Sequence, residues 1–471
     1  MQRINLRATR TRAIPALLGV LALWTLWIGA PSARASVSPG DTSEQGRHPG
    51  AAPSNVLYIT TNDPTPGGNA VLAFRRGVDG GLRPLGRFPM GGTGVGNPNF
   101  RLGTLDSDQS LIVSPDRRFL FAVNSGSDSI AVFHIHSDGT LAAVGGSPFP
   151  SGGHFPASLG LRGDFLYVAH KNEAPGEDPA DFPAPNYTAF RVNPNGTLIP
   201  IPRSTVETAR GSSPTQTLVS GDGRFVFSTE LLADFPTDFF PADGFPAAPG
   251  AGGGNTLRSF VIEPNGGLRP NPAIRIPDPD EAHPDPLGLL GGSAHVSGTT
   301  NGALGLANHP FLPILYVGFP LRFQLGVYTW DPMTGELSFA HVVDNSGQVI
   351  CWIRVRADGR FAYTSNQLDT TVSVYDLSDP LRPVEIAHTD LALAPGAAMG
   401  GLASQESLTP DGRFLYVIEQ RITDNAGDGS ANALHILAAT PGGGLAEPLP
   451  PINLGDLGVP RTARPQGIAA F

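Results

Sequence analysis

The chain is dominated by one repeated pattern, in which a strand ends in a tight turn and leads into a second strand rich in aromatic residues. Self-similarity of this kind indicates a repeat architecture, in which each copy is one supersecondary unit. The six full copies are LIVSPDRRFLFAVN (111–124), LGLRGDFLYVAH (159–170), LVSGDGRFVFSTE (218–230), LANHPFLPILYVGF (306–319), IRVRADGRFAYTSN (353–366) and LTPDGRFLYVIE (408–419). Apolar and polar residues alternate within the copies, as they do in strands.

A third strand and a weaker fourth strand follow each copy. The third strand ends in a second turn, as in AVFHIHSDGTL, TAFRVNPNGTL and RSFVIEPNGGL. The Asp-Gly and Asn-Gly pairs supply the positive φ angles that hairpin turns require. Gly (59) and Pro (47) are abundant, and both destabilise helix interiors, so a helical bundle is excluded. The pattern predicts an all-β fold, a seven-bladed β-propeller of four-stranded antiparallel blades.

The two ends of the chain are expected to close the ring. The stretch NVLYITT (55–61) is a seventh copy that lacks its first strand, and RPQGIAAF (464–471) can supply that strand. Pairing of the C-terminal strand with N-terminal strands removes an open sheet edge. The second strands are expected to begin at residues 56, 119, 165, 225, 314, 361 and 414.

The N-terminus has the features of an export signal. Four arginines within the first twelve residues precede the apolar stretch 13–30, and Ala33 and Ala35 form a small-x-small cleavage pattern. We expect a signal peptide at 1–35, a flexible linker at 36–54 and a periplasmic or secreted propeller at 55–471. An uncleaved membrane anchor is the alternative, because 18 apolar residues can just span a bilayer.

Charge and cysteine content argue against nucleic-acid binding, disulfide bonds and a cysteine-based zinc site. The chain has 31 basic and 41 acidic residues, and the first 35 residues hold five arginines and no acid. The remainder is therefore 26 basic against 41 acidic, a net charge of −15 that disfavours binding to nucleic acid. The single cysteine, Cys351, excludes an internal disulfide and a cysteine-cluster zinc site. We expect a monomer that meets a membrane only through an uncleaved signal segment.

The long inserts decide which face of the propeller can carry a site. In an up-and-down meander, the short first–second and third–fourth turns share one face, here called the short-turn face. The long connections share the opposite face, here called the insert face. The inserts are expected at 91–108, 171–186, 231–255 and 277–301. Long loops on a rigid scaffold are a common place for binding sites.

The repeat, with its xSPDGRFLYV stretches and Asn-Gly-Thr-Leu turn, resembles the seven-bladed lactonase family over residues 55–471. That family includes propeller-type 6-phosphogluconolactonases and carboxymuconate-lactonising enzymes. Its site motif joins Gly-Pro-Arg-His at the start of a first strand to Asn-Glu-Leu at the end of the second. Pro214, Glu230 and Leu231 match this motif, whereas Thr215 and Gln216 stand at the arginine and histidine positions.

The resemblance implies an exported lactonase-like enzyme that hydrolyses or isomerises a lactone or a cyclic sugar-acid derivative in the central funnel. The missing arginine and histidine favour an alternative, a non-catalytic propeller that binds a ligand or a partner protein through its insert face. A fold hosts many functions, so both remain open at this point.

Polar residues end most of the second strands. The sixth residues of these strands are Thr61, Asn124, His170, Glu230, Phe319, Asn366 and Glu419. They either form a polar ring at the funnel mouth or cap strand ends by hydrogen bonding to loops. Under the first interpretation Glu230 is the acid/base, since a carboxylate in a partly apolar funnel has a raised pKa.

Other residues complete the candidate site. His154, His170 and Glu419 are alternative catalytic groups, because histidine and glutamate can transfer protons near neutral pH. The expected substrate-binding residues are Gln216, Gln405, Glu406, Asn124, Asn366 and Gln466. Glutamine can orient water or donate to a carbonyl oxygen, although it cannot abstract a proton.

No cofactor and no metal are expected, with one open alternative. Acidic residues gather in PDPDEAHPDP (277–286) and TDNAGDGSAN (423–432), and oxygen-rich loops can bind Ca²⁺. Neither stretch has the EF-hand spacing, and acidic runs are commonly just hydrated surface.

Overall fold

The computed structural model describes residues 54–96, 107–171, 183–209, 212–231, 256–272, 274–275, 302–422, 427 and 429–471. The expected signal peptide, nearly all of the linker and most of the long inserts lie outside these residues. Among the described residues, no helix has the length and apolar character needed to cross a membrane.

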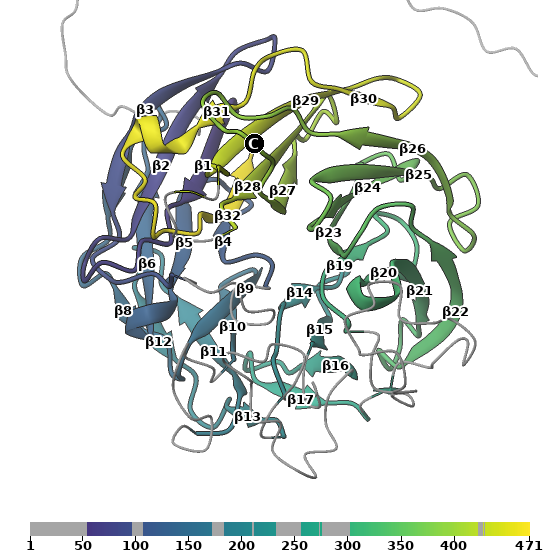
Figure 1. The fold of residues 1–471 in the computed structure, drawn as a ribbon. Helices are drawn as coiled ribbons and strands as arrows, with labels where there is room; N and C mark the ends of the chain where they lie inside the picture. Colours follow the sequence, from purple (N-terminus) through teal and green to yellow (C-terminus); the bar gives the residue numbers. More distant parts are fainter. Residues whose placement is uncertain are drawn as a thin grey trace, which may run out of the picture. The chain divides into compact units, whose positions relative to one another are not determined.

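The described strands form seven antiparallel sheets arranged in a ring, which confirms the predicted propeller (Figure 1). Each sheet is a meander, numbered here as blades 1 to 7 along the chain. The innermost strands of blades 1 to 7 are β32 (Gln466–Ala470), β4 (Leu111–Val113), β9 (Pro156–Arg162), β14 (Leu218–Val219), β19 (Leu306–Asn308), β23 (Ile350–Val355) and β27 (Leu402–Leu408). The second strands are β1 (Val56–Thr60), β5 (Phe119–Asn124), β10 (Phe165–His170), β15 (Phe225–Glu230), β20 (Ile314–Phe319), β24 (Phe361–Asn366) and β28 (Phe414–Gln420).

The third and fourth strands lie progressively further from the ring axis. The third strands are β2 (Ala70–Arg76), β6 (Ser129–Ile135), β11 (Asn186–Val192), β16 (Thr256–Ile262), β21 (Gln324–Trp330), β25 (Thr371–Asp376) and β29 (Ala433–Ala439). The fourth strands are β3 (Leu82–Pro89), β7 (Leu141–Ala143), β12 (Leu198–Pro200), β17 (Leu268–Pro270), β22 (Leu337–Asp344), β26 (Val384–Asp390) and β30 (Leu445–Ala446). Short strands extend four of the sheets: β8 (Phe149–Pro150), β13 (Val206–Glu207), β18 (Ile274–Arg275) and β31 (Ile452–Asn453).

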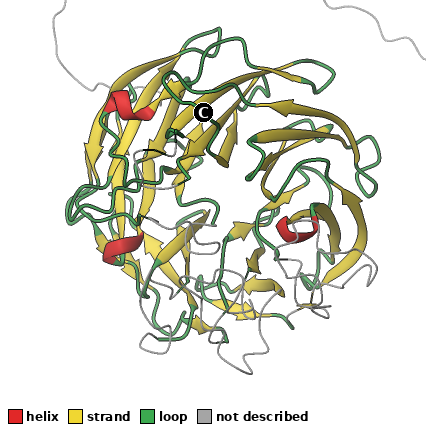
Figure 2. Ribbon diagram, viewed as in Figure 1, coloured by secondary structure: helices red, strands yellow, loops and turns green. Residues whose placement is uncertain are grey.

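Helical structure in the described residues is confined to short 3₁₀ turns (Figure 2). These turns are Ser125–Ser127, Pro320–Arg322 and Leu454–Leu457. The second strands begin at the seven residues expected from the repeat, because the first–second turns carry a strong local signal.

The C-terminal strand closes the ring as predicted. Strand β32 pairs with β1, with Tyr58 opposite Ala469. Val56 and Phe471 exchange two backbone hydrogen bonds of 3.0 Å. The N-terminal and C-terminal segments thus share one sheet, which leaves no open edge between blades 7 and 1.

The repeated first–second turns hold neighbouring blades together. The phenylalanine that follows such a turn packs against a glycine in the third–fourth turn of the next blade. Phe225 begins β15, and its ring lies against Gly335 in the third–fourth turn of blade 5, where a Cβ would come within 2.3 Å of the ring. Gly335 has a φ of +75°, which favours glycine. Arg224, in the same turn as Phe225, donates to the Met333 carbonyl (3.4 Å). Equivalent Phe–Gly contacts are Phe119–Gly196, Phe165–Gly266, Phe361–Gly443 and Phe414–Gly80.

The hydrophobic core lies between blades rather than in one central mass. One cluster joins Leu57 and Ile59 of blade 1 to Tyr416 and Ile418 of blade 7, and all four side chains are buried. Because each blade buries its apolar faces only against its neighbours, the stability of every blade depends on the closed ring.

Candidate functional site

The innermost strands surround the ring axis, and their two ends differ in exposure. At the insert face these strands begin with buried residues, such as Ile350 in β23 and Leu402 in β27. At the short-turn face they end with more exposed residues, such as Val355 in β23 and Arg162 in β9. The insert-face end of the axis is therefore the better sealed end within the described residues.

A backbone segment, Ser107–Gln109, seals that end. It lies one residue before β4 and binds innermost strands of several other blades. Trp352 Nε1 and Gln405 Nε2 both donate to the Ser107 carbonyl, at 2.9 and 2.6 Å. Gln466 Nε2 donates to Ser107 Oγ at 2.8 Å. These contacts tie the segment to blades 6, 7 and 1.

The same segment also binds blades 3 and 4. The Asp108 amide donates to the Thr215 carbonyl at 3.0 Å, and the Leu159 amide donates to the Gln109 carbonyl at 2.9 Å. Gln216 Nε2 donates to Gln109 Oε1 at 2.8 Å. Three predicted substrate-binding glutamines, at positions 216, 405 and 466, thus bind this segment in the structure.

An ion pair lies at the centre of this arrangement. Arg354 on β23 binds Asp108 with two contacts, Nη1 to Oδ2 at 2.6 Å and Nη2 to Oδ1 at 2.8 Å. The Asp108 side chain is 1% exposed, whereas the Arg354 side chain remains 22% exposed. Arg354 Nη1 also donates to the Ile353 carbonyl at 2.8 Å, and these contacts together fix the plane of the guanidinium.

Glu406 on β27 is a fully buried carboxyl group in the same region. Burial raises its pKa to about 8, although the positive charge of Arg354 opposes the shift. Its Oε1 has no hydrogen-bond partner among the described residues. Glu406 is therefore largely protonated at neutral pH.

The hydroxyl of Ser365 is compatible with the protonated form, whereas the backbone N–H of Arg354 favours the carboxylate and opposes part of the shift caused by burial. Ser365 Oγ lies 2.9 Å from both the Ser404 carbonyl and Glu406 Oε2. The hydroxyl has a single proton and can donate to only one of these oxygens. If Glu406 is protonated, it donates to Ser365 Oγ while Ser365 donates to Ser404, and both contacts are satisfied.

Glu230, the predicted acid/base, ends β15 beside the start of its own blade's innermost segment, where it forms a backbone bridge with Pro214. Its buried carboxylate is bound by Arg258 of β16, through Arg258 Nε to Oε1 and through Nη2 to Oε2 at 3.1 Å. Burial raises the pKa of Glu230, and Arg258 opposes that shift. Thr215, at the resembled family's arginine position, is buried and lies 3.1 Å from the Leu304 carbonyl.

The two predicted asparagines at strand ends bind the third strands of their own blades, and Asn124 Oδ1 also accepts a hydrogen bond from Asn69 Nδ2 of blade 1 at 3.0 Å. Asn124 Nδ2 donates to Ser129 Oγ at 3.2 Å, and Asn366 Nδ2 donates to Ser373 Oγ at 2.9 Å. Both side chains are buried. Their partners on β6 and β25 place these amides between second and third strands, away from the ring axis.

Glu419 belongs to a buried triad in blade 7. His435 Nε2 lies 2.7 Å from Glu419 Oε2, and His435 Nδ1 lies 2.9 Å from Glu447 Oε1. Burial alone would lower the pKa of His435, but the two carboxylates more than offset it and raise the pKa to about 9. The histidine is therefore a cation between two acids.

The two predicted histidines lie near each other at the insert face of blades 2 and 3. His154 Nδ1 is 2.7 Å from Asp128 Oδ2. His170 is fully buried at the end of β10, and burial lowers its pKa to about 4, so it is neutral at pH 7. Asp128 acts on both histidines, because it contacts His154 and its charge opposes part of the shift that burial causes in the pKa of His170.

No group of three or more His, Cys, Asp or Glu side chains suited to a metal ion occurs in the described part of the chain. The acidic stretch 277–286 lies outside that part, as does much of 423–432, so the calcium alternative stays untested.

Sequence reasoning did not find Asp108 or Arg354. Arg354 occupies a first strand, which the repeat identifies as innermost, two residues after Trp352. That position was a usable signal for an axial side chain. Asp108 gave no such signal, because it ends an insert and meets Arg354 only across the ring.

Comparisons with known proteins agree with this architecture. A family model described as "Lactonase, 7-bladed beta-propeller" matches residues 96–175. A periplasmic gluconolactonase of Pseudomonas aeruginosa is 17% identical, with 88% of this chain and 98% of that chain covered and a TM-score of 0.56. A Lactobacillus plantarum protein is 16% identical, with 89% and 99% covered and a TM-score of 0.59.

A third solved structure carries a different description. A hypothetical selenium-binding protein of Sulfolobus tokodaii is 13% identical, with 89% of this chain and 94% of that chain covered and a TM-score of 0.60. No curated protein matches the chain. At these identities the solved structures establish the propeller fold, and the family match confirms the resemblance to seven-bladed lactonases.

Proposed function

We propose that this chain, a seven-bladed propeller similar to the lactonases, is an exported enzyme that hydrolyses a sugar lactone at its ring axis. The observation that carries the proposal is a fully buried carboxylic acid, Glu406, whose pKa is raised to about 8, on the innermost strand next to the one that carries Arg354 and its ion pair with Asp108. A perturbed acid beside a fixed cation is typical of a catalytic site. The family match and the gluconolactonase neighbour support the reaction class.

The chemistry follows from these two groups. Water attacks the lactone carbonyl carbon, and the carbonyl oxygen becomes an oxyanion that Arg354 stabilises. The ring carbon–oxygen bond then breaks, and the leaving ring oxygen takes the proton of Glu406. The Glu406 carboxylate recovers a proton that derives from the attacking water, so the net reaction consumes one water and yields a hydroxy acid. Groups in these roles each contribute roughly 10²- to 10³-fold to the rate.

A second candidate is the non-catalytic propeller that binds a ligand or partner through its insert face. The observation that favours it is the sealing of the axis by Ser107–Gln109, which leaves Glu406 without solvent exposure. The matched family acid, Glu230, is also engaged by Arg258. Export is part of both proposals and is supported by the periplasmic neighbour.

The deciding experiment measures hydrolysis of glucono- and galactonolactones by the purified protein, with Arg354→Gln and Glu406→Gln as variants. The exposed Arg382→Gln serves as the matched control for charge. We expect both axial variants to lower kcat by roughly 10²-fold or more, with the control unchanged. Wild-type kcat should also fall as the pH rises above about 8, because Glu406 then loses its proton.

Two results would contradict the proposal that Glu406 and Arg354 catalyse lactone hydrolysis. Full activity in both axial variants would place the reaction elsewhere on the molecule. If the wild-type protein hydrolyses no lactone, and a lactone or hydroxy acid still raises its melting temperature, the binding function replaces the catalytic one.

A further inference from the structure

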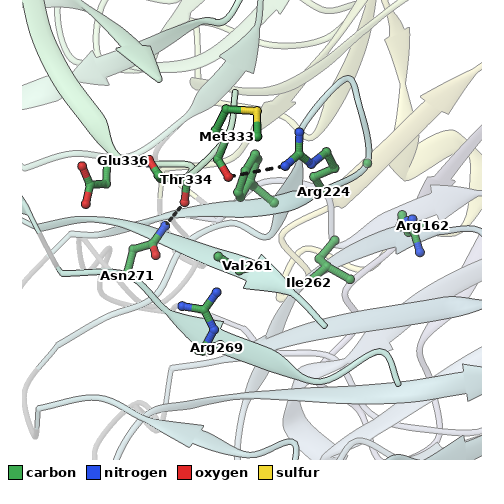
Figure 3. A pocket seen from close by; sticks show the side chains of 11 residues that line it. Arg162, Arg224, Val261, Ile262, Arg269, Asn271, Met333, Thr334 and Glu336 are labelled. Atoms are coloured by element: carbon green, nitrogen blue, oxygen red, sulfur yellow. Dashed lines mark hydrogen bonds between the residues drawn. The ribbon is translucent and has the colours of Figure 1, made fainter. Parts of the chain in front are cut away.

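We propose that the short-turn face of blade 4 holds a separate binding site for an oxyanion, a carboxylate or a phosphate group attached to an apolar body. The site is a groove of about 490 Å³ that contains three arginines, Arg162, Arg224 and Arg269 (Figure 3). It does not depend on the proposed lactonase activity, because none of its lining residues belongs to the Asp108–Arg354–Glu406 cluster.

The arginines come from separate elements that the fold holds rigidly. Arg162 ends β9 of blade 3, Arg224 lies in the turn before β15, and Arg269 lies on β17. The opposite wall is the third–fourth turn of blade 5. Three hydrogen bonds join that wall to blade 4: Arg224 Nη2 donates to the Met333 carbonyl (3.4 Å), Asn271 Nδ2 to the Thr334 carbonyl (2.8 Å), and Ser259 Oγ to the Gly335 carbonyl (2.6 Å). The groove is therefore preformed.

Among the seven blades, only blade 4 combines these three arginines. The equivalent positions in the other blades follow from the backbone pairing. They are the residue at the end of the innermost strand in the preceding blade, the residue just before the second strand, and the fourth-strand residue that pairs in line with the start of the second strand. For blades 1, 2 and 3 the triplets are Thr409/Asn55/Arg83, Phe471/Arg118/Ala142 and Ser114/Asp164/Ile199. For blades 5, 6 and 7 they are Ser220/Pro313/Ser338, His309/Arg360/Val384 and Arg356/Arg413/Ala446.

Only blade 4 places arginine at all three positions, so the propeller fold itself does not require this triplet. Blade 7 has two arginines, but Arg356 binds Asp358 with two contacts of 2.8 and 2.6 Å. The side chain of Arg162, its counterpart in the blade 4 groove, makes no hydrogen bond or ion pair with the described residues, although its backbone pairs with Phe165. Three arginines gathered in a chain of net negative charge indicate a site for an anion.

The surrounding groups define the ligand further. Glu336 lines the groove, and Glu263 lies 3.9 Å from Arg269, but both side chains of that pair are about half exposed and are screened by solvent. Asp331 accepts hydrogen bonds from the backbone of its own turn. Val261 and Ile262 supply a half-buried apolar floor. Guanidinium groups bind carboxylate and phosphate through two parallel contacts, and the floor suits an apolar substituent.

The test is calorimetric titration of the full purified protein with phenyl phosphate, benzoate and inorganic phosphate at low salt. We expect phenyl phosphate or benzoate to bind more tightly than inorganic phosphate, and added salt to weaken the binding. The double variant Arg162→Gln/Arg269→Gln should weaken binding at least tenfold. The control Arg83→Gln/Arg382→Gln removes the same charge from exposed positions and should bind as the wild type does.

Three outcomes would overturn the proposal. The first is the absence of binding by any probe at concentrations up to about 10 mM, weaker than a usual specific site. The second is an equal loss in both double variants, which would indicate attraction by overall charge. The third is tighter binding of inorganic phosphate than of either aromatic anion, which would show that Val261 and Ile262 do not contribute to ligand binding. A difference between phenyl phosphate and benzoate identifies which oxyanion the groove prefers.

Discussion

Replacing His435 with glutamine should destabilise the propeller in a way that depends on pH. The histidine is fully buried between Glu419 and Glu447. Both acids also accept backbone hydrogen bonds, Glu419 from Gly401 and Glu447 from Ala392 (2.8 Å). Glutamine keeps some hydrogen bonding but leaves two buried carboxylates without a cation, and removal of one partner of a buried ion pair costs about 3–5 kcal/mol.

The pKa of His435 sets the pH range of the effect. The pKa is raised from 6.5 to about 9, so the folded chain holds a proton that the unfolded chain releases between these values. The stabilisation is fully present below pH 6.5 and is lost as the pH rises through about 9. A shift of this size corresponds to about 3 kcal/mol of unfolding free energy.

The assay is thermal unfolding of the wild type and His435→Gln from pH 6 to 10, with the exposed His341→Gln as control. An unfolding entropy of about 2.1 cal/mol/K per residue predicts a shift of roughly 1 °C per kcal/mol for a chain of this length. We therefore expect His435→Gln to melt about 3–5 °C lower at pH 6.5, and most of that difference to vanish by pH 10. A difference below about 1 °C, or one that stays constant with pH, would refute the argument.

Three further changes test the architecture by thermal unfolding. Deleting residues 466–471 removes β32 and should lower the melting temperature far more than deleting residues 36–50; equal effects would argue against ring closure. Gly335→Ala should cost roughly 1–3 kcal/mol because of its φ of +75° and the Phe225 ring, whereas Gly221→Ala, which has open space, should be neutral. Glu230→Gln should cost about 2 kcal/mol by weakening its contact with Arg258, and an unchanged melting curve would show that this ion pair contributes nothing.

The starts of the second strands could be predicted from short stretches of sequence. Their starting residues were predictable because each follows a turn whose Asp-Gly or equivalent pair fixes the chain reversal over a few residues. Ring closure was predictable too, because a lone second strand at 55–61 needs a partner and the last residues have strand character. The resemblance to lactonases rests on the same repeated stretches.

The candidate site was less predictable, because side-chain partners are set by distance in space. The polar residues that end second strands suggested a ring at the funnel mouth. In the structure, Asn124, Asn366 and Glu419 bind third strands of their own blades, one position further from the axis. Only the innermost strands lie at the axis. Gln405 and Glu406 lie on innermost strand β27 and Gln216 just before β14, as expected from their positions at the start of first strands.

Local sequence patterns were enough to predict the propeller, the number of blades and the closing strand, because hairpin turns and strand alternation act between residues close along the chain. The contact of Asp108 with Arg354 across 246 positions of sequence, and the sealing of one end of the axis by Ser107–Gln109, arise only in the folded ring. It also decided the charge of Glu406 and of His435. Those charges depend on burial and on neighbours from other strands, and no local pattern carries that information.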